Sequence, residues 1–347
     1  MNQVLMDDFK KEINEISEYF RHIEYISNVI TLDKCEGLPL LQQLQEHHIK
    51  FRASRKKFEY KASIISLYGL LERYIEIWIH EYLGSLCKLI DSYRRLDKKL
   101  QDNHFDLSLK LIAIITGREN AKYQHLSKEI ILNKLHKCIS NSGSYSINPE
   151  AFTISSGNLK HKRIVSLFET INISLNSELK INKTLQLYFQ SERQISNIAN
   201  LSTENLFNTI DDLVERRNQI AHGSDISDIL DISALEPYLR FLEKYCQAVF
   251  EILDKEIIKQ ESIYKLEKIT RVIKVINNSI LAFEIENKTI RVGDRLIIET
   301  VDGDFYRTSV LSIQLDNESY SEIEITDKRQ IGVKVDCRIR QNQSFYI

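Results

Sequence analysis

The fold is decided by residues 64–82, Ile64-Ile65-Ser66-Leu67-Tyr68-Gly69-Leu70-Leu71-Glu72-Arg73-Tyr74-Ile75-Glu76-Ile77-Trp78-Ile79-His80-Glu81-Tyr82. On a helix with this sequence, apolar side chains cover more than half of the circumference. Such a helix is buried against several neighbours, so we expect it at the centre of a helical core. The pattern extends from about Phe58 to Leu89 and continues back, with little interruption, to about Leu40. We expect Trp78 to be a core residue.

Helical patterns continue on both sides of this stretch. Apolar residues recur at steps of three and four in the segments 7–30, 107–115, 128–138, 162–168, 185–198, 203–221 and 235–267. The chain has only 3 prolines and 10 glycines in 347 residues, which favours long helices. We therefore predict a mainly α-helical bundle, with a polar insertion at about 140–200 between core helices.

The pattern changes after residue 268. Six short β-branched runs follow at 271–276, 281–285, 295–299, 308–313, 322–325 and 331–335, separated by turn residues such as Gly293-Asp294 and Asp302-Gly303. This spacing is typical of a small all-β barrel. We predict two domains, a helical domain at 1–268 and a β-barrel domain at 269–347.

The overall charge indicates no general attraction to nucleic acid. The chain carries 47 basic and 49 acidic side chains, so affinity for a polyanion must come from local patches. The five cysteines are scattered and form no C-x-x-C pair, which fits a reducing compartment better than disulfides or a zinc site. No signal peptide or membrane-spanning run is visible, so we expect a cytoplasmic protein without a membrane partner.

Two basic clusters are candidate RNA contacts. Arg52, Arg55, Lys56 and Lys57 lie among aromatic residues before the central stretch, and Arg94 and Arg95 follow it. Basic residues interleaved with aromatics can follow an RNA backbone and stack on bases. The alternative, a solvated helix face, is the more frequent reading for each cluster by itself.

The candidate catalytic residues lie in the segment Leu213-Val214-Glu215-Arg216-Arg217-Asn218-Gln219-Ile220-Ala221-His222-Gly223. Asn218 and His222 share a helix face, and Gly223 suits the position just after a helix end. Arg217 can hold one phosphate with two donors, and His222 can move a proton near neutral pH. Arg216 points away from this face and is either a phosphate contact or a solvated charge.

These residues predict RNA cleavage without metal or cofactor. No carboxylate cluster or Cys/His cage accompanies them, and the chemistry would use the ribose 2′-hydroxyl and leave a 2′,3′-cyclic phosphate. One histidine cannot readily be both acid and base in one step, so a homodimer could complete the site. The alternative is structural, because arginine and histidine at a helix end often cap the helix or pair with carboxylates.

The segment Glu215 to Gly223 resembles the signature of the HEPN superfamily, and particularly its RiboL-PSP-HEPN branch. The resemblance implies a helical bundle that dimerises, so that two motifs form one endoribonuclease site. It assigns the family's arginine to Arg217, its polar residue to Asn218 and its histidine to His222. The helix that carries Glu72 fits the family's long core helix.

Segments 290–298, 310–313 and 329–335 are similar to the second-domain β-barrel of translational GTPases. Such barrels contact tRNA or ribosomal RNA, so this one could direct the chain to such RNA or dock a partner. No P-loop precedes it, so GTPase activity is not implied.

We therefore expect a toxin or antiphage (abortive infection) endoribonuclease, with RNA and an antitoxin or defence protein as partners. The alternative is a non-catalytic HEPN module that binds RNA or a partner protein.

Overall fold

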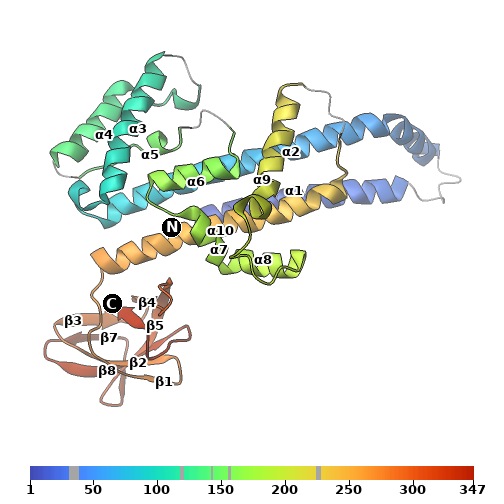
Figure 1. Ribbon diagram of the computed structural model, residues 1–347. Coiled ribbons are helices and arrows are strands. Elements are labelled where there is room, and N and C mark those ends of the chain that lie inside the picture. Colours follow the sequence, from blue (N-terminus) through green and yellow to red (C-terminus); the bar gives the residue numbers. More distant parts are fainter. Residues whose placement is uncertain (31–38, 118–120, 142–143, 155–157, 224–227) are drawn as a thin grey trace. The chain divides into compact units, whose positions relative to one another are not determined.

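A computed structural model describes residues 1–30, 39–117, 121–141, 144–154, 158–223 and 228–347 (Figure 1). Contacts divide the chain into two compact units. The helical unit contains residues 1–84 and 92–252, and the sheet unit contains residues 85–91 and 253–347. A helical region followed by an antiparallel sheet confirms the predicted fold class.

The helices of the described residues cover most of the chain before residue 265. They are α1 (Gln3–Ile30), α2 (Pro39–Leu89), η1 (Tyr93–Arg95), α3 (Lys98–Gly117), η2 (Ala121–Tyr123), α4 (Lys128–Ser140), α5 (Pro149–Phe152), α6 (His161–Thr170), α7 (Leu175–Ile181), α8 (Lys183–Arg193), α9 (Thr203–Ala221) and α10 (Ile232–Tyr264). Among them, none is both long and apolar enough to cross a bilayer.

The central helix α2 is continuous over 51 residues, as its apolar pattern predicts. Trp78 is fully buried and packs edge-on against Phe9 of α1 and Phe250 of α10, with ring centroids 5.4 and 5.5 Å away. α1 runs antiparallel to α2, since Glu12 near its start contacts Arg73 and Ile30 at its end accepts a hydrogen bond from Gln45. The core of the helical unit therefore forms around the stretch that decides the fold.

Two details of the helical unit go beyond the sequence prediction. The region predicted as a polar insertion contains α5 to α8, and it buries aromatic residues such as Phe152, Phe168 and Phe189. α10 starts at Ile232, three residues before the predicted segment 235–267, and the carbonyl of Asp231 accepts its first backbone hydrogen bonds.

The sheet unit contains the six predicted strands and three short additional ones. The strands are β1 (Val272–Ile276), β2 (Ile280–Ile285), β3 (Lys288–Arg291), β4 (Arg295–Glu299), β5 (Phe305–Leu315), β6 (Glu318–Tyr320), β7 (Glu322–Ile325), β8 (Arg329–Val335) and β9 (Ser344–Tyr346). The main sheet has the order β1-β2-β8-β5-β4-β9, β6 pairs with β5, and β3 pairs with β7. All pairs are antiparallel, and the sheet curls into a half-barrel around an apolar core that includes Leu281, Phe283 and Phe345 (Figure 1).

The last turns of α10 belong to the sheet unit. Arg307 of β5 binds Glu261 at 2.8 Å and Asp254 at 3.2 Å, both on α10. The backbone of Glu267 then exchanges two hydrogen bonds with Ile347. The charged end of α10 therefore packs on the sheet, and the contact boundary between the units falls at residues 252 and 253.

Candidate active site on helix α9

Helix α9 is anchored along one face, which fixes the direction of its C-terminal end. Ser202 caps its start by accepting a hydrogen bond from the backbone N–H of Asn205. Its apolar face is buried through Leu206, Phe207, Ile210, Leu213 and Val214. The ring of His161 stacks on Phe207 with centroids 4.1 Å apart, and the backbone N–H of His161 donates to Asp211. The polar motif at the other end is thereby presented from a rigid helix.

His222 ends α9 and is exposed. Its backbone N–H donates to the carbonyl of Asn218 at 2.9 Å, and its own ψ of 1° departs from the helical conformation. Gly223 follows with φ +66°, a left-handed conformation that glycine adopts without strain, as predicted. Among the described residues, none hydrogen-bonds or pairs with the imidazole of His222. The ring is therefore accessible to a ligand.

Arg217 is held by neutral groups. Its Nη1 donates to Oδ1 of Asn218 at 3.2 Å and to Oδ1 of Asn158 at 3.3 Å. Its guanidinium carbon lies 4.6 Å from the ring centroid of Tyr68, a buried residue of α2. Within the part of the chain that the structure describes, no carboxylate pairs with Arg217. Its positive charge is therefore positioned but not neutralised, as an anion-binding side chain requires.

Arg216 has the opposite environment. Its guanidinium binds Asp212 at 2.7 Å, Asp228 at 2.8 Å and the hydroxyl of Tyr60 at 3.1 Å, and its side chain is 14% exposed. Burial alone would lower the pKa of Arg216, but the bonds to Tyr60, Asp228 and Asp212 raise it above its usual value. Arg216 is therefore not a solvated charge, and it links α9 to α2 and to the start of α10.

A third charged pair lies on the face of α9 that carries Asn218 and His222. Lys160 binds Glu215 at 2.7 Å, and this hydrogen bond raises the pKa of Lys160 and lowers the pKa of Glu215. Both side chains are exposed, so a polyanion can reach Lys160. The sequence offered no signal for Lys160, Asn158 or Tyr68, because they come from segments distant from the motif.

The first predicted basic cluster lines an open groove of about 1160 Å³ between the end of α1, the first half of α2 and residues 230–233. Arg52, Arg55 and Lys56 lie on its walls. Arg55 contacts His48, Ser27 and Glu59, and Lys56 pairs with Asp231, whereas Lys57 is exposed. Tyr60 lines the same groove and accepts the hydrogen bond from Arg216, so the groove adjoins the motif.

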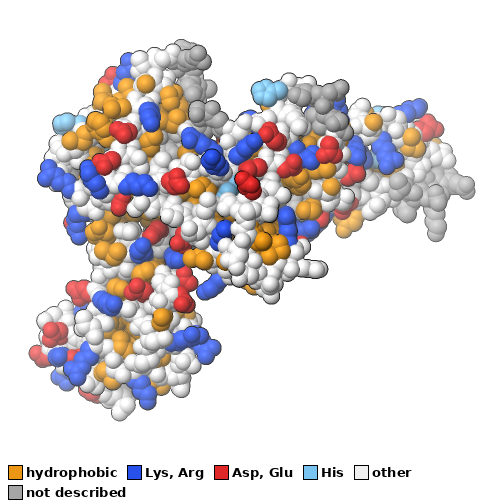
Figure 2. All heavy atoms as spheres, viewed as in Figure 1, with side chains coloured by type: hydrophobic (Ala, Val, Ile, Leu, Met, Phe, Trp, Pro, Cys, Tyr) orange, Lys and Arg blue, Asp and Glu red, His pale blue; other side chains and the backbone are white. Residues whose placement is uncertain are grey.

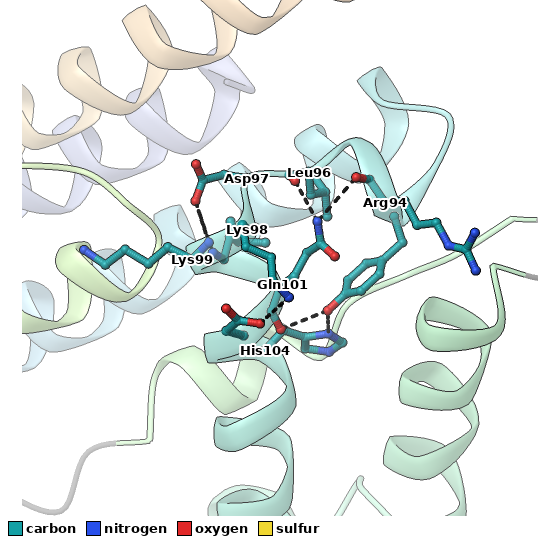
Figure 3. Close-up of polar contacts among 10 residues, drawn as sticks. Arg94, Leu96, Asp97, Lys98, Lys99, Gln101 and His104 are labelled. Carbon is teal, nitrogen blue, oxygen red and sulfur yellow. Dashed lines mark hydrogen bonds and ion pairs between the residues drawn. The ribbon is translucent and has the colours of Figure 1, made fainter.

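The second basic cluster is remote from the motif. Arg94 and Arg95 are exposed on η1, which follows the far end of α2, about 30 Å along the helix from Tyr68. Figure 3 shows the Arg94 side chain extending outward, while its backbone carbonyl and that of Leu96 accept hydrogen bonds from Gln101. The structure therefore does not bring Arg94 and Arg95 together with Arg217.

The charge on the visible surface is mixed. Figure 2 shows Lys and Arg side chains interspersed with Asp and Glu over the face in view. This pattern agrees with the nearly equal numbers of basic and acidic residues in the chain. Any RNA contact must therefore be local, as the sequence predicts.

The chain matches a known protein family over a region that contains the motif. The family model described as RiboL-PSP-HEPN matches residues 7–255, which is more than two thirds of the 347 residues. The match contains the whole of α9, including Arg217, Asn218 and His222. A search of curated proteins found no match.

Proposed function

Because the chain belongs to the RiboL-PSP-HEPN family, whose HEPN domains are typically ribonucleases, we propose that it is a metal-independent endoribonuclease. One observation carries the proposal: Arg217 has an uncompensated charge on the same helix end that exposes His222. A positioned cation next to an accessible imidazole is what phosphodiester cleavage by proton transfer requires.

The chemistry needs three roles. A base removes the proton of the ribose 2′-hydroxyl, the freed oxygen attacks the adjacent phosphorus, and the bond to the 5′-oxygen breaks as an acid protonates that oxygen. Arg217 would hold the phosphate and stabilise its added negative charge. Asn218 would keep Arg217 in place through the contact of 3.2 Å between Oδ1 and Nη1.

His222 would act as general base or general acid. The end of α9 carries a single histidine, His222. The second proton-transfer group would therefore be His222 of a second copy of the chain. The two imidazoles would then divide the work, one accepting the 2′-proton and the other donating to the leaving 5′-oxygen.

RNA would approach along the basic groove next to the motif. Arg52, Arg55 and Lys56 line this groove and contribute positive charge, although Glu24, Glu59 and Asp231 partly offset it. We therefore propose that these contacts guide the strand and that Arg217 holds the cleaved phosphate. The half-barrel would either direct the enzyme to tRNA or ribosome-associated RNA or dock a partner protein.

The biological role we propose is that of a toxin or antiphage effector in the cytoplasm. An enzyme that cleaves cellular RNA harms its own host, so its activity needs an antitoxin or a defence-system partner that restrains it. The accessible position of His222 fits such control, because a partner that covers the end of α9 would block the site.

A second candidate function is a non-catalytic module that binds RNA or a partner protein. One observation favours it: among the described residues, no side chain orients the imidazole of His222, whereas catalytic histidines usually have such a partner. In this case Arg217 would bind a phosphate without cleavage.

Cleavage by the purified chain in the presence of EDTA separates the two candidates. We expect wild-type protein to cut RNA, and Arg217→Ala and His222→Ala each to lower the rate by roughly 100-fold or more. His136→Ala and Arg295→Ala, exposed residues outside the motif, are matched controls that should retain activity. RNA binding without any cleavage would favour the second candidate.

A further inference from the structure

A short segment, residues 158–161, lies beside α9 and is fixed to it at both of its ends. The backbone N–H of His161 donates to Asp211, in the middle of the helix, at 2.7 Å. At the other end of the segment, Asn158 accepts a hydrogen bond from Arg217 at 3.3 Å. The segment therefore follows α9 from its middle to the proposed site.

The lysine of this segment, Lys160, has a fixed backbone. Leu159 before it is 2% exposed, and its N–H donates to the hydroxyl of Tyr68 at 3.4 Å. The carbonyl of Lys160 accepts hydrogen bonds from the backbone N–H groups of Arg163 and Ile164, in the first turn of α6. Because the main chain is held on both sides, binding a ligand costs mainly the freedom of the lysine side chain itself.

Lys160 faces the stripe of α9 that ends at His222. The stripe consists of residues at steps of four, three and four, which lie on one side of a helix: Asp211, Glu215, Asn218 and His222. Lys160 binds Glu215 at 2.7 Å, and Glu215 lies seven residues, or about 10 Å, before His222. The ammonium group is therefore on the same side of α9 as the imidazole, about two turns away.

The basic groove meets α9 on another side. Arg216, which donates to the groove residue Tyr60, is about 100° around the helix from Glu215. Lys160 therefore offers a positive charge near the site that the groove does not supply.

We propose that Lys160 binds a backbone phosphate of the RNA next to the phosphate that Arg217 holds, and that it leaves Glu215 to do so. Its placement rests on the proposed function, because Arg217 and His222 define where the strand lies. The side chains of Lys160 and Glu215 are 43% and 56% exposed, so a phosphate can reach the pair. An ion pair this exposed is weak, and a phosphate on a strand that Arg217 already holds can replace the carboxylate.

Glu215 competes with the RNA for Lys160. The bonds from Lys160 and Asn218 lower the pKa of the Glu215 carboxyl, so this group is ionised at neutral pH. When Lys160 moves to a phosphate, Asn218 remains as a partner of Glu215. The carboxylate thus weakens RNA binding, and removing its charge should strengthen it.

The contact requires a substrate with more than one phosphate. A dinucleoside monophosphate has only the phosphate that is cleaved, so it leaves Lys160 without a ligand. Longer RNA carries phosphates on either side of the cleaved bond. The substrate class that uses Lys160 is therefore an oligonucleotide, and not a dinucleotide.

Binding of a short 2′-fluoro RNA oligonucleotide tests the contact. This RNA lacks the 2′-hydroxyl and cannot be cleaved, so its Kd is measurable whether or not the chain is an enzyme. We expect Lys160→Ala to raise the Kd by roughly fivefold and to reduce the slope of log affinity against log salt concentration by about 0.7, the value for one phosphate contact with a single strand. Lys160→Arg, which keeps the charge, should retain the wild-type Kd and slope.

A second lysine provides the matched control. Lys259 of α10 is 45% exposed and pairs with Glu256 at 3.0 Å, so Lys259→Ala removes a similar ion pair and should leave the Kd and the slope unchanged. Circular dichroism establishes that each variant is folded. A wild type that does not bind the oligonucleotide, or equal Kd values and slopes for Lys160→Ala and Lys259→Ala, overturns the proposal.

Glu215→Gln tests the exchange of partners. Gln can keep the bond to Asn218, and we expect the Kd to fall by roughly threefold, because Lys160 is then uncompensated. The same substitution in the Lys160→Ala background should have a smaller effect. An equal gain in both backgrounds would show that Glu215 does not act through Lys160, and would overturn the exchange.

Cleavage is measured separately on two substrates. We expect Lys160→Ala to lower kcat/KM for an RNA oligonucleotide by roughly fivefold and to leave kcat/KM for a dinucleoside monophosphate unchanged. A chain that shows the expected changes in binding but cleaves neither substrate refutes the proposed function alone. A chain that cleaves RNA and keeps its wild-type kcat/KM on both substrates after Lys160→Ala refutes the role of Lys160 alone.

Discussion

The guanidinium carbon of Arg217 lies 4.6 Å from the centroid of the Tyr68 ring. The Tyr68 hydroxyl accepts a hydrogen bond from the backbone N–H of Leu159, and the residue is buried in α2. The central helix of the fold thus supplies a fixed aromatic surface for an arginine on α9. A cation resting on a fixed ring keeps its charge and loses little further freedom when it binds an anion.

Removing the ring should weaken catalysis more than folding. We expect Tyr68→Leu to lower the rate of RNA cleavage by roughly 10-fold, while Tyr68→Phe, which keeps the ring, stays within about threefold of wild type. Single-turnover cleavage measured with protein that is folded by circular dichroism checks this. Tyr188→Leu, at a buried tyrosine of α8, is the control; an equal loss there would mean that the effect is only structural.

Replacing Arg216 should destabilise the fold, whereas replacing its neighbour Arg217 should not. Arg216→Ala removes a mostly buried guanidinium together with its bonds to Asp212, Asp228 and Tyr60, so we expect the free energy of unfolding to fall by about 2 kcal/mol. Arg217→Ala breaks no ion pair among the described residues and should change it by less than about 1 kcal/mol. Urea denaturation measures both. Equal losses for the two variants would contradict the different roles assigned to them.

Some of these roles can be predicted from the sequence, and others cannot. The pattern of residues 64–82 predicts the central helix, and Gly223 predicts the helix end, because both depend on local periodicity or conformation. The environment of Arg216 depends on Asp228 and Tyr60, which meet it only through tertiary contacts. Spacing around α9 therefore could not distinguish the neutralised arginine from the uncompensated one.

The same limit applies to the sheet. Six of its strands, β1, β2, β4, β5, β7 and β8, follow from β-branched runs between turn residues, and the structure confirms them. The short strands β3, β6 and β9 were not predicted, since three or four residues of mixed polarity carry no clear alternation. These three strands are held in place by hydrogen bonds to β7, β5 and β4, respectively, and such long-range pairing cannot be read from the local sequence.

Acid should destabilise the helical unit through His104. Burial lowers the pKa of His104 from 6.5 to about 4, and its Nε2 accepts a hydrogen bond from the backbone of Asn148. The unfolded chain therefore binds a proton between about pH 6.5 and pH 4 that the folded chain does not. This histidine's contribution is complete above pH 6.5 and is lost as the pH falls to about 4, a change of about 3 kcal/mol.

Unfolding free energies measured from pH 7 to pH 4 check this prediction. His104→Gln removes the proton linkage, so its stability should depend on pH less steeply than that of wild type over this range. His136→Gln, at an exposed position, is the control and should keep the wild-type slope. Identical slopes for all three proteins would show that His104 is not the group responsible.

The central claim is that His222 moves a proton during RNA cleavage, and the chemistry of the product ends tests it most directly. RNA from cells that express the wild-type chain or His222→Ala would be mapped for 2′,3′-cyclic phosphate ends. We expect discrete cyclic-phosphate ends with wild type and their loss with His222→Ala at equal protein level. The same ends in both samples, or their absence from wild type when the protein is active against cells, would contradict the claim.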